Sequence, residues 1–261
     1  MTMIRKKVRM EDRIMPIRNM VTAKKSQKME WLSDLHCHML PCIDDGASSI
    51  EMAYEMLEMS ALQGVKQIVF TPHFDVDRQN LHEFLKARQR SFESIQACID
   101  RLGIKARLGA EIYFRSHMAW EEVQQLCFEN TPYFLVELSV LNEPVGLNEW
   151  IREAVSKGWI PLIAHVERYR YIKENPEILK EWIHSGAYIQ SNAGWFLKSR
   201  HNKKIFKKYM ENGWIDCISS DAHDIRYRMP NLQKAYQKLD SVSKEKLRIQ
   251  GNMIFEGKTW K

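Results

Sequence analysis

The stretch that decides the fold runs from Trp31 to Gly46 and reads WLSDLHCHMLPCIDDG. Its first residues, 31–36, are a short apolar run of the kind that forms a buried strand. His36 and His38 stand two residues apart at the end of this run, so on an extended chain both side chains point to the same side. Two imidazoles in this arrangement can bind one metal ion. The stretch therefore predicts a strand that ends in a candidate metal site.

Six further apolar runs follow, and longer amphipathic segments separate them. We predict strands at residues 31–36, 66–71, 106–112, 133–138, 160–165, 187–191 and 215–220. We predict helices at residues 48–63, 81–102, 147–157, 176–184, 201–212 and 231–239. The first of these helices has a candidate N-cap at Ser48 or Ser49, and glycines end several of the others. Strands that alternate with helices close into a barrel or open into a doubly wound sheet.

Polar residues end most of the predicted strands. These strand-end residues are His36, His38, Thr71, His73, Glu111, Glu137, His165, Asn192, Asp221 and His223. In a barrel the carboxyl ends of the strands converge on one face, where active sites lie. A parallel strand buried on both faces is expected to be apolar, so polar ends on so many strands need a shared reason. A metal cluster supplies one.

Each candidate ligand also has a structural interpretation. Alone, the histidines that end the second and fifth strands are more typical of hydrogen-bonded loop residues than of ligands. The His-x-His pair is weak evidence alone, but Asp45 before the turn at Gly46 strengthens it. Glu111 and Glu137 lie inside apolar runs, where a buried carboxylate needs a cation or an arginine as partner.

The strings DLHCHMLPCIDDG, TPHF, GAEIYF, VELS, IAHVERY and SDAH, in this order and spacing, resemble the polymerase and histidinol phosphatase (PHP) superfamily. More narrowly, the chain is similar to the bacterial manganese-dependent protein-tyrosine phosphatases encoded with capsule and exopolysaccharide genes. The resemblance covers about residues 31–242. It implies an α/β fold, a distorted seven-stranded (β/α) barrel of the PHP type, as a single domain over residues 31–261. It also implies three divalent metal ions, with manganese first and iron or zinc as alternatives.

The resemblance assigns a role to each candidate ligand. The first ion would be held by His36, His38, Glu111 and Asp221. The second would share the bridging Glu111 and add Glu137 and His165. The third would be held by Asp45, His73 and His223. Two arginines would bind phosphate, Arg168 and Arg228, with Arg226 as a rival for the second. At Asn192, where a relative has histidine, we expect no ligand.

The implied reaction is hydrolysis of phosphotyrosine on a protein, such as the tail of a bacterial tyrosine kinase that controls capsule or exopolysaccharide synthesis. Metal ions acidify water, and the arginines offset negative charge on the phosphoryl oxygens. A histidinol-phosphate or other small-molecule phosphatase would use the same chemistry, and a degenerate, metal-stabilised binding module is a third interpretation. Aromatic residues near the ligands could stack the substrate ring or simply pack in the core: Phe74, Tyr113, Phe114, Tyr169, Trp195 and Tyr227.

Composition narrows the class further. Residues 1–30 hold nine Lys or Arg against three Asp or Glu, so they account for the whole net charge of +6. We expect a basic, disordered extension there that can touch an acidic partner, including peripheral contact with a membrane kinase complex, and no nucleic-acid-binding face. The sequence has no apolar run suited to a transmembrane or secretory segment, so we expect a cytoplasmic protein. None of the five cysteines is followed six positions later by arginine, which excludes the phosphate loop of cysteine phosphatases.

Overall fold

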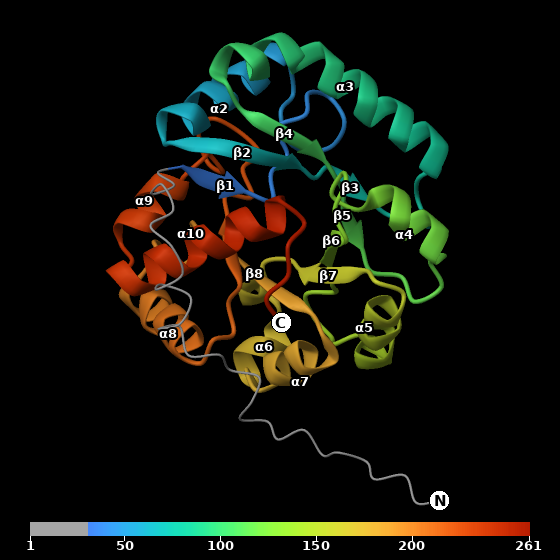
Figure 1. Cartoon of the computed structure of the whole chain (residues 1–261), viewed down its shortest axis with the longest axis vertical. Helices are drawn as coiled ribbons and strands as arrows, with labels where there is room; N and C mark the ends of the chain where they lie inside the picture. The colour runs from blue at the N-terminus through green and yellow to red at the C-terminus, as the bar shows by residue number, and fades with distance from the viewer. Residues whose placement is uncertain (1–30) are drawn as a thin grey trace, which may run out of the picture. The chain divides into compact units, whose positions relative to one another are not determined.

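The computed structural model describes residues 31–261, of which Trp31–Thr259 form one compact unit. The basic segment 1–30, with the disorder predicted for it, lies outside the described residues. Within the compact unit, strands alternate with helices along the chain, and the helices surround the strands (Figure 1). The amphipathic segments of the sequence thus bury their apolar faces against the sheets.

The strands of the described part form two parallel sheets. The three-stranded sheet has the order β1 (Leu32–Asp34), β2 (Val65–Phe70) and β4 (Lys105–Leu108). The six-stranded sheet has the order β3 (His73–Phe74), β5 (Glu111–Tyr113), β6 (Tyr133–Glu137), β7 (Ile160–Ile163), β8 (Tyr188–Asn192) and β9 (Cys217–Ser219). Just beyond β1 and β9, an isolated parallel bridge joins Cys37 to Ala222.

All seven predicted strand positions contain a strand, but the hydrogen bonding gives a six-stranded parallel sheet and a smaller one instead of a single seven-stranded sheet. The predicted strand 106–112 is broken into β4 and β5 at Gly109 and Ala110, and an added Cβ at Gly109 would lie 2.8 Å from a ring carbon of Phe128. On the neighbouring strand, Pro72 has no N–H to donate, and the short β3 begins directly after it. The sequence prediction did not include β3.

The helices of the described part are α2 (Ile50–Leu62), α3 (Leu81–Leu102), α4 (Trp120–Leu126), α5 (Leu147–Ser156), the 3₁₀ helix η2 (Val166–Arg168), α6 (Arg170–Glu174), α7 (Ile178–Ser185), α8 (Arg200–Glu211), α9 (Leu232–Gln237) and α10 (Ser241–Phe255). Of the two candidate caps for α2, Ser49 is the N-cap, and its side chain accepts a hydrogen bond from the Met52 N–H. The sequence prediction missed α4, α6 and α10. None of these helices is long and apolar enough to cross a membrane.

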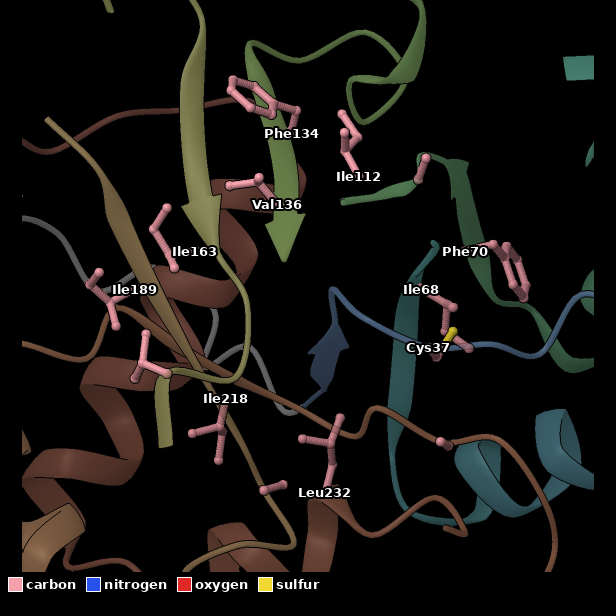
Figure 2. Close-up of a cluster of buried hydrophobic side chains, with 14 of the residues drawn as sticks. Cys37, Ile68, Phe70, Ile112, Phe134, Val136, Ile163, Ile189, Ile218 and Leu232 are labelled. Atoms are coloured by element: carbon pink, nitrogen blue, oxygen red, sulfur yellow. The ribbon is translucent and has the colours of Figure 1, made fainter. Parts of the chain in front are cut away.

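One face of the six-stranded sheet packs against the helices. Figure 2 shows its apolar side chains, which include Ile112, Val136, Ile163, Ile189 and Ile218, one from each of β5 to β9. All five are at most 1% exposed and belong to a buried cluster that also contains Trp150 of α5. Because side chains alternate along a strand, Glu111 and Glu137, which neighbour these residues, point to the opposite face.

Helix α10 covers the end of the strands opposite to their carboxyl ends. Gln67, early in β2, donates a hydrogen bond to Asn252 of α10, and the hydroxyl of Tyr133, the first residue of β6, donates to the carbonyl of Lys258. The helix buries Arg248 as well as apolar residues, so its sequence shows no simple apolar stripe. With this end covered, the carboxyl ends of the strands are left to carry the site.

Candidate metal centre

The carboxyl ends of the strands bring all nine predicted ligands together. Their ligand atoms form four overlapping groups, each with all atoms within 4.8 Å of one another. The groups are His36, His38 and Asp221; His36, Glu111 and His165; His73, Glu111 and Glu137; and His38, Asp45, His73 and His223. Because the groups share residues, they form one continuous cluster.

The His-x-His pair follows β1 and is fully buried. The Nε2 atoms of His36 and His38 lie 3.1 Å apart. Nδ1 of His38 lies 2.7 Å from a carboxylate oxygen of Asp44 and donates to it, so Nε2 of His38 is free to act as a ligand. Burial alone would lower the pKa of His38, but the hydrogen bond to Asp44 and the nearby carboxylate of Glu111 raise it to about 10. Without metal, this position therefore favours a proton, and a metal cation would take the proton's place.

Glu111 lies at the centre of the cluster and is 1% exposed. Its Oε1 is 2.7 Å from Nε2 of His165. Its Oε2 is 3.2 Å from Nε2 of both His36 and His38 and 3.0 Å from Nδ1 of His73. Despite these close nitrogens, Oε2 has no hydrogen-bond partner among the described residues. A buried carboxylate oxygen that faces three imidazoles without a hydrogen bond fits a bridging metal ligand.

The shifted pKa values of two other cluster residues, Glu137 and His223, also fit a bound cation. Burial and the charge of Glu111 raise the pKa of Glu137 to about 7. Burial and the charge of His38 lower the pKa of His223 to about 3, and Nε2 of His223 is buried without a hydrogen-bond partner among the described residues. A divalent cation would favour both the ionised carboxylate and the neutral imidazole, which are the ligand forms.

The group around Asp45 is the exposed part of the cluster. The Asp45 side chain is 65% exposed, and its Oδ1 lies 3.4 Å from Nε2 of both His73 and His223. The His73 side chain is itself 37% exposed, whereas those of His36 and His38 are buried. A ligand that approaches from solvent therefore reaches this side of the cluster first.

Both predicted phosphate-binding arginines reach one carboxylate of the cluster. Arg168 Nη2 donates to Oδ2 of Asp221, and Arg228 Nη2 donates to its Oδ1 at 2.9 Å. The two arginine side chains are 35% and 38% exposed, so they contact the cluster and solvent at once. Arg226, the rival to Arg228, is exposed, and the bond it makes to Asp224 uses its backbone N–H. The geometry favours Arg228.

Sequence reasoning took Asp45 as the functional aspartate of the Asp-Asp-Gly turn and gave Asp44 no role. The structure shows that the Asp44 carboxylate accepts hydrogen bonds from Nδ1 of His38 and from the backbone N–H groups of Gly46 and His73. Gly46 is required in this turn, because an added Cβ would collide with the His38 carbonyl. In the sequence, the pair of aspartates before glycine was the signal that could have pointed to a role for Asp44.

The predicted aromatic residues differ in exposure: Phe74 and Tyr169 are buried, Tyr227 is exposed, and Tyr113, Phe114 and Trp195 are partly buried. Phe74 and Tyr169 are at most 1% exposed and pack in the core, so stacking of substrate on them is excluded. The hydroxyl oxygen of Tyr169 instead accepts a hydrogen bond from the backbone N–H of Leu138 at 3.0 Å. Tyr227 is 92% exposed, next to Arg228. It is the one member of the predicted set that is clearly available at the surface.

The profile of the capsular polysaccharide synthesis family CpsB/CapC matches residues 32–253. The chain belongs to the CpsB/CapC family. A relative in Streptococcus agalactiae, tyrosine-protein phosphatase CpsB, is 28% identical over 222 residues, which cover 78% of this chain and 88% of the relative. The tyrosine-protein phosphatase CpsB of Streptococcus pneumoniae is 30% identical over 220 residues, covering 78% and 87%.

Solved structures give the same family assignment. One match comes from the crystal structures of YwqE from Bacillus subtilis and CpsB from Streptococcus pneumoniae, described as metal-dependent tyrosine phosphatases. It superposes with a TM-score of 0.77 at 25% identity and covers 87% of this chain and 96% of that one. A phosphotriesterase homology protein of Escherichia coli, at a TM-score of 0.53 and 12% identity, shares the fold alone. The CpsB/CapC family is thus supported by both sequence and structure.

Proposed function

We propose that this chain is a metal-dependent protein-tyrosine phosphatase that acts in capsule or exopolysaccharide synthesis. The observation that carries the proposal is the meeting of Arg168 and Arg228 on Asp221, a member of the nine-residue cluster of histidines and carboxylates. Arginines beside a metal centre suit a phosphoryl group, which presents several anionic oxygens. The names of the CpsB relatives and the matched metal-dependent tyrosine phosphatases support the same reaction.

The proposed cofactors are three divalent ions, manganese first, with iron or zinc as alternatives. The cluster offers five imidazoles and four carboxylates, and such mixed nitrogen and oxygen donors suit these metals better than calcium or magnesium. We assign the ligands to the ions as the family resemblance implies. Bound ions would acidify a water and offset charge on the phosphoryl oxygens.

The residues of the chain have separate tasks in this proposal. Arg168 and Arg228 bind and orient the phosphoryl group, because their partly exposed side chains contact Asp221 of the cluster. Burial opposes ionisation of Asp221, but His36 and Arg168 lower its pKa, so it is ionised at neutral pH. An ionised Asp221 cannot donate a proton to the leaving tyrosyl oxygen. We therefore infer that this proton comes from water or from His38.

We also propose that the two sheets make up one distorted seven-stranded barrel. Support comes from the continuity of β2 with β3 and of β4 with β5, each pair a single chain segment with one break. The first and last segments are joined by hydrogen bonds from the His38 N–H to Ala222 and from the Asp221 N–H to His36, both 2.9 Å long. In a closed barrel all the strand ends face one centre, as the convergence of the ligands requires.

The proposed substrate is phosphotyrosine in a flexible protein segment, such as the tail of a bacterial tyrosine kinase. The exposure of Asp45 and of both arginines supports an open site that a protein segment can reach. Histidinol phosphate is a small molecule that an enclosed pocket would suit better. The exposed Tyr227 beside Arg228 offers a ring against which a phenyl group can pack.

The test is to compare kcat/KM on a phosphotyrosine peptide, a phosphoserine peptide and histidinol phosphate at equal manganese loading. We expect the phosphotyrosine peptide to be preferred over both. A preference of about tenfold or more for histidinol phosphate, about 1.4 kcal/mol of transition-state binding, would transfer the assignment to a small-molecule phosphatase. Absence of turnover on all three substrates in manganese-loaded protein would contradict the proposed activity.

A further inference from the structure

Strand β8 carries two amide side chains beside the metal centre that the ligand assignment does not use. Gln190 is fully buried and Asn192 is partly buried. We propose that Gln190 and Asn192 form an amide relay, a hydrogen-bonded chain that positions His36, His165 and Asp221 to bind metal. The inference rests on the metal centre of the proposed function. It concerns positioning residues, which act through the ligands and do not touch the substrate.

Two groups fix which atom donates and which accepts along the relay: a backbone N–H at one end and a carboxylate at the other. The backbone N–H of His165 donates to Oε1 of Gln190 at 2.6 Å, and a backbone N–H can only donate, so this atom must be the oxygen. Nε2 of Gln190 then donates to Oδ1 of Asn192 at 2.9 Å. Nδ2 of Asn192 donates to Oδ2 of Asp221 at 2.6 Å, and an ionised carboxylate can only accept.

The relay also offers the acceptor that the metal-binding tautomer of one ligand needs. Nδ1 of His36 lies 3.4 Å from Oε1 of Gln190, which is an acceptor. When Nε2 of His36 binds a metal ion, the ring hydrogen is on Nδ1, where the Gln190 oxygen can accept it. Asp44 likewise accepts the hydrogen on Nδ1 of His38. The two rings of the His-x-His pair therefore present the same nitrogen to the metal.

The relay holds the two ligand residues with the least favourable backbone. His165 has φ of 28° and Asp221 has φ of 50°, in the left-handed region that costs a non-glycine residue about 1–3 kcal/mol. Of the nine predicted ligands, only these two have positive φ among the described residues. Gln190 binds the backbone of the first, and Asn192 binds the carboxylate of the second. The relay thus supports those strand ends that cannot hold their ligand geometry through regular strand conformation.

The experiment measures manganese affinity by competition with a fluorescent chelator in full-length Gln190→Leu and Asn192→Leu proteins. We expect both variants to bind manganese about 10- to 100-fold more weakly than the wild type, since loss of such supporting hydrogen bonds commonly has this effect. Saturating manganese should restore most of kcat on p-nitrophenyl phosphate, because positioning residues leave the reacting groups in place.

Gln67→Leu is the matched control. Gln67 is also a buried strand glutamine and bonds Ser33 and Asn252, but it lies at the α10 end of the strands. We expect its manganese affinity to stay within about threefold of wild type, because it supports no ligand. Asn192 is only partly buried, so Asn192→Leu provides the measurement even if Gln190→Leu does not fold.

The outcomes separate the relay from the proposed function. Wild-type affinity in a folded relay variant, or an equal loss in Gln67→Leu, would overturn the relay while the metal centre stands. A wild-type protein that binds no manganese, iron or zinc would overturn the metal centre, and the relay would fall with it. Weaker manganese binding in the relay variants, without such a loss in Gln67→Leu, supports both the relay and the metal centre.

Discussion

Asp44 and Asp45 are neighbours in the sequence, but the structure gives them different tasks. The side chain of Asp44 is 5% exposed and holds His38, whereas that of Asp45 is 65% exposed and lies 3.4 Å from two histidine nitrogens. We predict that Asp44→Asn lowers the stability of the metal-free protein. We predict that Asp45→Asn leaves that stability nearly unchanged and lowers the metal content instead.

The magnitude follows from the bonds of Asp44. Burial alone would raise its pKa, but the hydrogen bond with His38 lowers it from 3.8 to about 2, equivalent to about 2 kcal/mol. Asp44 also accepts from the N–H groups of Gly46 and His73, and an asparagine would turn its NH₂ group toward one of these donors. One lost hydrogen bond adds about 1 kcal/mol. The expected loss is therefore about 3 kcal/mol.

Urea unfolding of chelator-treated protein at pH 6 measures this loss. The lowered pKa of Asp44 contributes stability above its unfolded value of 3.8, and this contribution is lost as the pH falls through about 2. The raised pKa of His38 contributes fully below 6.5, and this contribution is lost as the pH rises through about 10. At pH 6 the pair is thus ionised in the folded protein. A loss below about 1 kcal/mol for Asp44→Asn, or an equal loss for Asp45→Asn, would refute the division of tasks.

Three further predictions follow from the site and its surroundings. Chelation should abolish hydrolysis of p-nitrophenyl phosphate and manganese should restore it, whereas iodoacetamide should leave turnover within about twofold, because Cys42 is the exposed cysteine and the other four are buried. His36→Ala and Asp221→Ala should each lower turnover at least about 100-fold, since each removes a ligand, and wild-type turnover in either would show that the site is misplaced. Burial raises the pKa of Asp34 to about 6, so the contribution of this group to stability is fully present below pH 3.8 and falls by about 3 kcal/mol as the pH rises through 6. In thermal melts of chelated protein, Asp34→Asn should lack this contribution to the pH dependence, and a pH profile equal to that of the wild type would contradict it.

The order of the elements was predictable because its signals are local. Apolar runs gave the seven strand positions, and Gly103 ends α3 where the sequence predicts, with φ of 61°. The break at Gly109 goes with a close contact to the ring of Phe128, which packs where a Cβ would be. That contact joins residues far apart in the chain, so no local pattern reveals it.

The clustering of the candidate ligands was likewise easier to predict than the contacts of the residues around them. Strand-end histidines and carboxylates stand out in apolar runs, and the structure brings them together. The sequence does not distinguish Asp44 from Asp45, and only the position of the His38 ring shows which of them bonds to it. Gln190 gave a weak signal as a polar residue in a buried strand, but its role depends on bonds to His165 and, through Asn192, to Asp221. Such roles require the folded geometry.

The position of α10 has a consequence for the movement of reactants. The helix covers one end of the strands, and the buried Leu135 and Leu162 lie on the same face of the sheet as Glu111. Substrate and products must then enter and leave on the same side, at the carboxyl ends of the strands. In the proposed reaction the two products would leave past Arg168 and Arg228, and inorganic phosphate bound there would delay the next substrate.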